Sequence, residues 1–192
     1  MRSARVTLIH PPTLTSADAY GLDVVPPLGL AYVASALKAA GHQVSLVDGM
    51  GEALQQFNRA PGYPGLLIHG LPLAAVTSRI DPEADVIGIS SMFSNQWLFI
   101  RDLTFEIKKV YPDKLLVLGG EHPTACAEYI IRTCKNVDVC ALGEGEETLA
   151  DLASAHASGL SLENVAGIVF RGPNWPVRTA KRERIRAVDA IP

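Results

Sequence analysis

A run of six residues, GGEHPT at positions 119–124, combines several groups that could hold a ligand. The two glycines allow positive φ and leave no Cβ between the backbone and a bound molecule. His122 adds an imidazole and Thr124 a hydroxyl group. Small residues of this kind suit a crevice at the carboxyl end of a parallel sheet. The same glycines would also serve if they only closed a turn between a strand and a helix.

Three other runs have a related character and also follow apolar stretches. They are HPP at 10–12, SSMF at 90–93 and GEGE at 143–146. Gly or Ser occupies the turn in three of the four runs, including GGEHPT. Small residues with free N–H groups at successive loops would suit a large ligand that carries many amide or phosphate groups.

Nucleotide and hydrolase signatures are missing from these runs. The first strand is not followed by a Gly-rich dinucleotide fingerprint, and no Gly-Lys-Ser/Thr phosphate loop occurs. The acidic GEGE run disfavours a bare phosphate at that position. No nucleophile–base pair is evident, and the spacing of His, Cys, Asp and Glu indicates no metal site. His10 and His122 are expected at the ligand edge, whereas His42 and His156 are expected at the surface at helix ends.

The elements that must position these runs follow from the apolar pattern. Continuous apolar runs, typical of strands buried on both faces, predict strands at Arg5–His10, Gln43–Val47, Asp85–Ser90, Leu115–Leu118 and Val137–Leu142. Helical spacing predicts helices at Leu28–Ala40, Gln96–Val110 and Glu147–Ala157, and another that Pro123 opens. Strands and helices therefore alternate along the chain.

Less regular segments lie between and after these elements. We expect a long loop from Thr13 to Val25, a short helix at Glu52–Arg59 and a helix at Leu71–Ile80. Gly167–Phe170 reads as a short final strand, and Gly172-Pro173-Asn174 with Val177 beyond it indicates a hairpin.

The alternation predicts an α/β fold. We expect an open, parallel five-stranded sheet of the Rossmann-like (flavodoxin-like) type, with strand order 2-1-3-4-5 and helices on both faces. The strand at Gly167–Phe170 would extend one edge. In this order the loops after strands one, three, four and five share one edge of the sheet, which is where the four runs described above fall.

The composition limits the class of protein. A chain of 192 residues with 48% hydrophobic residues can form one sizeable core, and its net charge of −3 gives no support for a nucleic-acid or membrane partner. No apolar run reaches membrane-spanning length, and no signal peptide precedes the first strand. Cys126, Cys134 and Cys140 are odd in number and lack Cys-x-x-Cys spacing, so we expect reduced thiols in a cytoplasmic protein.

The last residues differ from the rest of the chain. From Thr179 onward the sequence is basic and weakly apolar, with Lys181, Arg182, Arg184 and Arg186 close together. Short charge runs are usually exposed. We therefore predict a domain at 1–178 and a linker at 179–192.

Four segments, in this order, carry a family resemblance. They are PPLGLAYVASALKAAGHQVSLVD, DVIGISSMFSNQW, LGGEHPT and LGEGEETL. Together they resemble the amino-terminal cobalamin-binding domain of cobalamin-dependent radical S-adenosylmethionine (SAM) enzymes. The resemblance covers nearly the whole chain, and the final IRAVDAIP is similar to the link to the radical SAM domain.

The resemblance implies a cofactor, its site and a partner. The corrin ring of cobalamin would lie over the carboxyl edge of the sheet, and the nucleotide tail would pass beside strands four and five. Cofactor-binding residues carried over are Ser90, Ser91, Met92, Gly119, Gly120, His122, Pro123, Thr124, Gly143, Glu144 and Gly145. The chain itself would be a non-catalytic module of a methyltransferase-like enzyme, partnered by a C-terminal radical SAM domain of the same polypeptide.

Two departures refine this expectation. Methionine-synthase-type domains carry Asp-x-His-x-x-Gly after strand one, but this chain has Asp18-Ala19-Tyr20-Gly21 there, so base-off cobalamin without a protein imidazole is expected. The Cys-x-x-x-Cys-x-x-Cys triad that holds a 4Fe-4S cluster is also missing, which places the cluster and SAM in a domain absent from this chain. Alternatives are a scaffold module that kept the fold and lost cobalamin, or a flavodoxin-like flavin- or nucleotide-binding domain.

Overall fold

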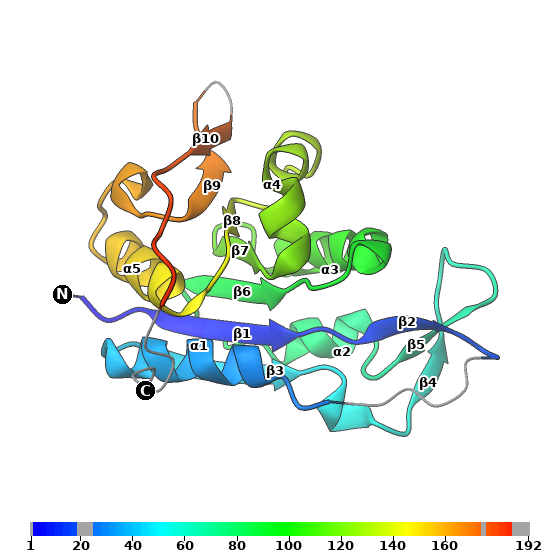
Figure 1. Ribbon diagram of the computed structural model, residues 1–192. Helices are drawn as coiled ribbons and strands as arrows, with labels where there is room; N and C mark the ends of the chain where they lie inside the picture. Colours follow the sequence, from blue (N-terminus) through cyan, green and yellow to red (C-terminus); the bar gives the residue numbers. More distant parts are fainter. Residues whose placement is uncertain (1, 19–24, 174–175, 186–192) are drawn as a thin grey trace.

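Five parallel strands form the centre of the main sheet (Figure 1). The computed structural model of the protein describes residues 2–18, 25–173 and 176–185. The parallel strands are β1 (Arg5–His10), β3 (Gln43–Asp48), β6 (Val86–Ser90), β7 (Leu115–Gly119) and β8 (Val139–Ala141). They lie in the order β3-β1-β6-β7-β8, which confirms the predicted order 2-1-3-4-5.

Two more strands extend the sheet beyond the five parallel ones, and the first of them corresponds to the edge strand predicted at Gly167–Phe170. β9 (Ile168–Arg171) pairs antiparallel with β8, and β10 (Pro176–Arg178) pairs antiparallel with β9. The hairpin expected around residues 172–177 joins them, although residues 174 and 175 lie outside the described residues. Antiparallel edge strands are common on otherwise parallel sheets, since a short connection suffices for them.

Helices cover both faces of the sheet, as predicted. α1 (Leu28–Ala39) and α5 (Glu146–Ala157) lie together on one face, in front of the sheet in Figure 1. Buried Leu37 and Leu152 from these helices belong to one core cluster with Val6 and Leu8 of β1. Alternate side chains of a strand point to opposite faces, so Ile9 of the same strand belongs to the other cluster.

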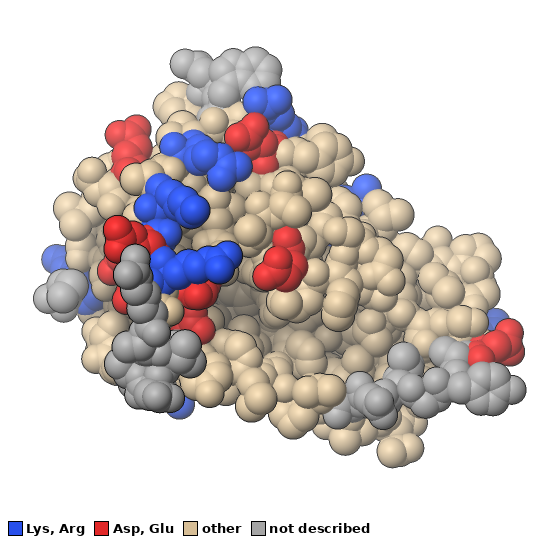
Figure 2. Space-filling view, viewed as in Figure 1, with Lys and Arg blue, Asp and Glu red and all other residues tan. Residues whose placement is uncertain are grey.

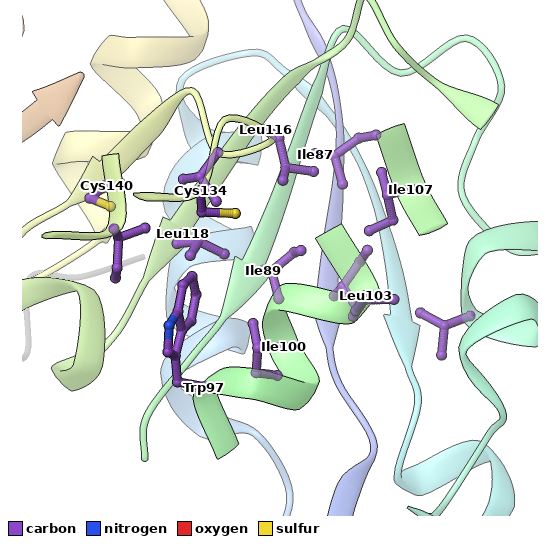
Figure 3. Close-up of a cluster of buried hydrophobic side chains, with 14 of the residues drawn as sticks. Ile87, Ile89, Trp97, Ile100, Leu103, Ile107, Leu116, Leu118, Cys134 and Cys140 are labelled. Carbon is purple, nitrogen blue, oxygen red and sulfur yellow. The ribbon is translucent and has the colours of Figure 1, made fainter. Parts of the chain in front are cut away.

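The second face carries α2 (Leu73–Ser78), α3 (Trp97–Val110) and α4 (Glu121–Thr133). Figure 3 shows Ile100, Leu103 and Ile107 of α3 together with Ile87 and Ile89 of β6 in this core. Each of these side chains is at most 2% exposed. Burial of such an aliphatic side chain contributes about 1.5–3 kcal/mol relative to an exposed one, so this layer holds the strand ends of the main sheet in place. In the described part of the chain, no helix is both long and apolar enough to cross a membrane.

A small antiparallel sheet stands beyond the ends of β1 and β3, and it corrects two predictions. Its order is β2-β5-β4, formed by β2 (Thr13–Ser16), β5 (Leu66–His69) and β4 (Phe57–Arg59). The loop predicted from Thr13 to Val25 therefore begins with a strand, and its residues 19–24 lie outside the described residues.

The helix predicted at Glu52–Arg59 is also wrong. A single 3₁₀ turn at Gly51–Ala53 precedes β4, which pairs residue by residue with β5. Leu54 and Phe57 in this segment are about half exposed, so it buries no apolar face of the kind that stabilises a surface helix.

Candidate functional site

The carboxyl ends of β1, β6, β7 and β8 frame a cleft of about 670 Å³. Figure 2 shows a hollow near the middle of this face, bordered mostly by uncharged surface, with charged side chains gathered to one side. The cleft is where the strand order reverses between β1 and β6, the position at which open α/β sheets bind ligands. Helices α1 and α5 supply its other wall through residues such as Leu30, Val33 and Leu149.

The deep end of the cleft is an apolar slot between the sheet and these two helices. Leu8, Gly88, Val117 and Ala141 from four neighbouring strands line its sheet side. A Cβ on Gly88 would lie 2.9 Å from a methyl carbon of Leu8. A larger residue at position 88 would therefore clash with Leu8 and crowd the slot.

Gly119 and Gly120 have different roles at the edge of the cleft. A Cβ on Gly119 would meet no atom within 4 Å, so its backbone faces open space in the cleft. Gly120 has φ of +111°, and a Cβ there would lie 2.7 Å from the carbonyl oxygen of Ser91. Gly120 is thus required by the turn itself, whereas Gly119 leaves room for a ligand.

The structure brings most of the predicted binding residues to the cleft, but not all of them. The predicted residues that line it are Ser90, Ser91, Met92, Gly119, Gly120, Gly143, Glu144 and Gly145. His122, Pro123 and Thr124 are not among its lining residues. These three lie in the first turn of α4, where the chain turns away from the cleft.

His122 is packed behind the cleft rather than in it. Its side chain is buried, its Nδ1 lies 2.8 Å from Oγ of Ser94, and its ring lies 5.1 Å from that of Trp97. Burial lowers the pKa of His122, so the imidazole is neutral near pH 7. Its role here is to anchor the loop after β6 against α4.

Thr124 links two of the loops that border the cleft. Its hydroxyl donates to the carbonyl oxygen of Gly120 at 2.8 Å and accepts a hydrogen bond from the backbone N–H of Gly143 at 2.9 Å. The glycine turns after β7 and β8 are therefore held together by one side chain.

His10 stands at the end of β1, where the strand order reverses. Its Nδ1 lies 2.8 Å from Oδ1 of Asp48, and the same oxygen accepts the backbone N–H of Gly51 at 2.8 Å. An ionised carboxylate only accepts hydrogen bonds, so Nδ1 of His10 is the donor. His10 is the imidazole among the cleft-lining residues.

Two cleft-lining residues carry buried polar atoms that have no hydrogen-bond partner within the described chain. They are Oγ of Ser91, a residue that is 1% exposed, and Oε2 of Glu146 at the start of α5. Buried polar atoms in proteins are nearly always paired. These two atoms are therefore available to a ligand with hydrogen-bonding groups.

Several lining residues were not among the predicted binding residues. They include Val25, Leu30, Val33 and Met50, together with Phe93 and Glu146 at the ends of two of the predicted runs. His10, which was expected at the ligand edge, lines the cleft as predicted. Phe93 is 69% exposed and Val25 is 64% exposed, so the mouth of the cleft has an apolar rim. The run of exposed apolar residues beside Pro26-Pro27 was the available signal for the α1 side. Met50 lines the cleft because it follows β3, which ends beside β1.

The other titratable clusters of the chain show no metal centre. Within the ranges that the structure describes, no three or more His, Cys, Asp or Glu residues lie close enough to hold a metal ion. Burial raises the pKa of the Cys140 thiol to about 12, and nearby Cys134 adds to this shift. All three cysteines are free.

An open parallel sheet whose strand ends frame a ligand-sized cleft defines a cofactor-binding α/β domain. The chain belongs to the B12-binding domain family, whose model matches residues 19–153. This match confirms the resemblance carried by the four sequence segments, and it identifies cobalamin as the cofactor of the family.

Curated relatives are longer than this chain. An uncharacterized methyltransferase of Pyrococcus horikoshii is 29% identical over 193 residues, which cover all of this chain and 38% of the relative. Cytidylyl-2-hydroxyethylphosphonate methyltransferase of Streptomyces wedmorensis is 34% identical over 159 residues, covering 79% of this chain and 28% of the relative. The chain thus spans well under half of either protein.

Solved structures share the fold. The radical SAM methyltransferase TsrM from Kitasatospora setae, with cobalamin and a [4Fe-4S] cluster bound, superposes with a TM-score of 0.70 at 16% identity. The match covers 97% of this chain and 30% of that protein. The cobalamin-dependent radical SAM enzyme OxsB, with aqua-cobalamin and SAM bound, superposes with a TM-score of 0.67 at 18% identity. This match covers 95% of this chain and 23% of that protein. At these identities the similarity concerns the fold.

Proposed function

We propose that this chain is the cobalamin-binding module of a radical SAM enzyme of the methyltransferase type. The observation that carries the proposal is the cleft at the carboxyl edge of the sheet, with open backbone at Gly119 and unpaired polar atoms at Ser91 and Glu146. The module would occupy residues 1–178, with 179–192 leading towards the radical SAM domain of a cytoplasmic protein. By itself it would be non-catalytic.

The residues of the cleft fit the chemistry of cobalamin. The corrin ring is edged by primary amides, which can donate to Oε2 of Glu146 and accept from the hydroxyl of Ser91. The methyl groups between these amides suit the exposed apolar rim at Val25, Met92 and Phe93. Gly119, Gly143 and Gly145 would hold the cofactor through backbone rather than side chains.

The apolar slot supports the base-off form of the cofactor. The aromatic base at the end of the nucleotide tail is largely apolar, as is the lining that Leu8, Gly88 and Val117 give this part of the cleft. A base bound in this slot is separated from the cobalt. Once bound, cobalamin would supply a cobalt centre that carries a methyl group or tunes a radical reaction, and the residues of this chain would hold it and keep water from one face.

We also propose that no protein imidazole ligates the cobalt. The described part of the segment after β2 has no His, and His10 is held by Asp48 on β3. Electron paramagnetic resonance of the cob(II)alamin form should therefore show no strong nitrogen coupling. Nitrogen coupling that vanishes in His10→Ala would identify His10 as the ligand and overturn this part of the proposal.

Retention of cobalamin tests the proposal as a whole. The chain would be mixed with hydroxocobalamin or with FMN, desalted, and examined by absorbance. We expect corrin bands to elute with the protein and flavin bands not to do so. Retention of FMN alone would support a flavodoxin-like domain, and retention of neither would support a scaffold module that has lost its cofactor.

A further inference from the structure

Residues 179–185, here called the strap, lie against the domain instead of leaving its surface. The strap follows β10, and in Figure 1 it runs as the red final segment past α5. Its first residues pair with β9 and the turn before it: Thr179 N–H donates to the carbonyl oxygen of Ile168 at 3.0 Å, and Gly167 N–H donates to that of Ala180 at 2.8 Å.

Arg182 fastens the strap to α5. Its guanidinium contacts the carboxylates of Glu147, at 3.1 Å, and of Asp151, and it donates to the carbonyl oxygen of Ala166 at 3.4 Å. Only 16% of its side chain is exposed. A half-enclosed arginine with two carboxylate partners is held more firmly than a typical surface pair.

The end of the strap reaches the wall of the cleft. The backbone N–H of Ile185 donates to Oε2 of Glu144 at 2.7 Å. Glu144 lines the cleft and lies between Gly143 and Gly145, in the loop that Thr124 also holds through the Gly143 N–H. The strap is therefore in direct contact with a loop that borders the proposed cofactor.

Negative charge is concentrated beside this contact. Glu144, Glu146, Glu147 and Asp151 lie within one turn or two of each other at the start of α5, and like charges at this spacing repel. Figure 2 shows Lys and Arg side chains gathered against Asp and Glu side chains beside the hollow. The strap offsets the repulsion with a guanidinium on one side and a backbone N–H on the other.

We infer that the strap is part of the cofactor site and that Arg182 is its positioning residue. By fixing the strap, Arg182 presents the Ile185 N–H to Glu144 and keeps the 143–145 loop in the shape that receives the corrin edge. This inference rests on the proposed function. Because coupling is reciprocal, cofactor in the cleft should in turn make the strap harder to displace.

Substitution of Arg182 tests the inference with two readouts. Affinity for hydroxocobalamin would be measured by absorbance titration, and backbone hydrogen exchange by mass spectrometry without cofactor. In Arg182→Ala we expect cobalamin affinity to fall by about threefold or more and exchange at 143–145 and 185 to rise. Arg182→Lys should restore part of both. Arg178→Ala is the matched control, because Arg178 pairs only with surface Glu128 on α4 in the described contacts.

A second pair of variants tests the contact at the end of the strap. Ile185→Pro removes the N–H that Glu144 accepts, whereas Ile185→Ala keeps it. Only the proline variant should lose cobalamin affinity and gain exchange at 143–145. Circular dichroism would establish that each variant is folded.

The outcomes separate this inference from the proposed function. If Arg182→Ala binds cobalamin and exchanges its 143–145 amides like the parent chain, the strap is no part of the site. If the parent chain binds no cobalamin, the proposed function fails. Hydrogen exchange then still tests whether the strap holds the loop. Unchanged exchange of the 143–145 amides in Arg182→Ala would show that it does not.

Discussion

At the scale of single residues, the site depends on two neighbouring glycines that have separate jobs. Position 120 requires glycine because its φ is positive and a Cβ would clash with Ser91. At position 119 the lack of a side chain leaves space in the cleft for a ligand. Sequence reasoning identified both, because a Gly pair after a buried strand is a local signal. It could not separate their roles, since those depend on Ser91 and Met92 from the neighbouring strand end.

The environment of a histidine also depends on residues that are distant in the sequence. His42 was expected at the surface at a helix end, but the prediction is wrong because its ring is buried. Its Nδ1 accepts the backbone N–H of Ala4 at 3.1 Å, and its Nε2 lies 3.1 Å from Oγ of Ser154. These partners are 38 and 112 residues away in the sequence, so no local pattern could indicate them.

Replacement of Gly120 by valine should abolish cobalamin retention. The new Cβ would meet the Ser91 carbonyl oxygen and the Met92 sulfur, so the loop after β6, which lines the cleft, must change its shape. Backbone strain at φ of +111° adds about 1–3 kcal/mol of destabilisation. Retention would be followed by absorbance after desalting, and folding by circular dichroism.

Gly41→Val is the control for this variant. Gly41 has φ of +87° and no atom within 4 Å of an added Cβ, and it lies at the opposite edge of the sheet. It should carry similar strain and keep its cobalamin. A folded Gly120→Val chain that retains cobalamin like the parent would place the cofactor elsewhere.

The burial of His122 predicts a pH dependence of stability. Its pKa is lowered in the folded chain, so the unfolded chain binds the proton first as the pH falls. The stability that neutral His122 contributes is present above about pH 6.5 and is lost as the pH falls below that value. Urea unfolding at pH 7 and pH 5.5 should show a smaller loss of stability in His122→Gln than in the parent. An equal loss in both chains would contradict the buried neutral imidazole.

At the scale of elements, the parallel core could be predicted and the small sheet could not. Strands β1, β6 and β7 can be recognised in the sequence as continuous apolar runs, because they are buried on both faces. β2 and β4 have only four and three residues, and each depends on β5 for its pairing. Thr13 pairs with His69, 56 positions away, which no local periodicity can reveal.

Gly70 joins the small sheet to the main one, and its replacement should be costly. A Cβ at Gly70 would lie 2.3 Å from the carbonyl oxygen of Gly49, which also accepts the N–H of Leu71 at 2.7 Å. Gly70→Ala therefore combines positive φ with a backbone clash. We expect destabilisation well above the roughly 1 kcal/mol of positive φ alone, measured by urea unfolding.

Gly62→Ala provides the comparison for Gly70→Ala. Gly62 has φ of +84° and no atom within 4 Å of an added Cβ. The loss of stability in Gly62→Ala should therefore come from the positive φ alone. Equal destabilisation of the two variants would show that the junction between the sheets is loose.

At the scale of the whole molecule, the chain is a cofactor domain that spans a minor part of its longer relatives. Its class and cofactor followed from the family resemblance of four short segments read together, which the family match confirms. The reaction and its substrate did not follow, since no described residue of the cleft forms a nucleophile–base pair. Any radical chemistry in our proposal belongs to a domain outside this chain.

The cobalt content of the desalted chain, compared between the parent and Gly119→Val, tests the central claim most directly. Gly119 lines the cleft, and a Cβ at this position would meet no atom within 4 Å, so we expect valine there to leave the unfolding midpoint nearly unchanged. After mixing with hydroxocobalamin, we predict cobalt in equimolar amount with the parent chain and almost none with Gly119→Val. A parent chain without cobalt, or a valine variant that retains as much as the parent, would contradict a cofactor held at this edge of the sheet.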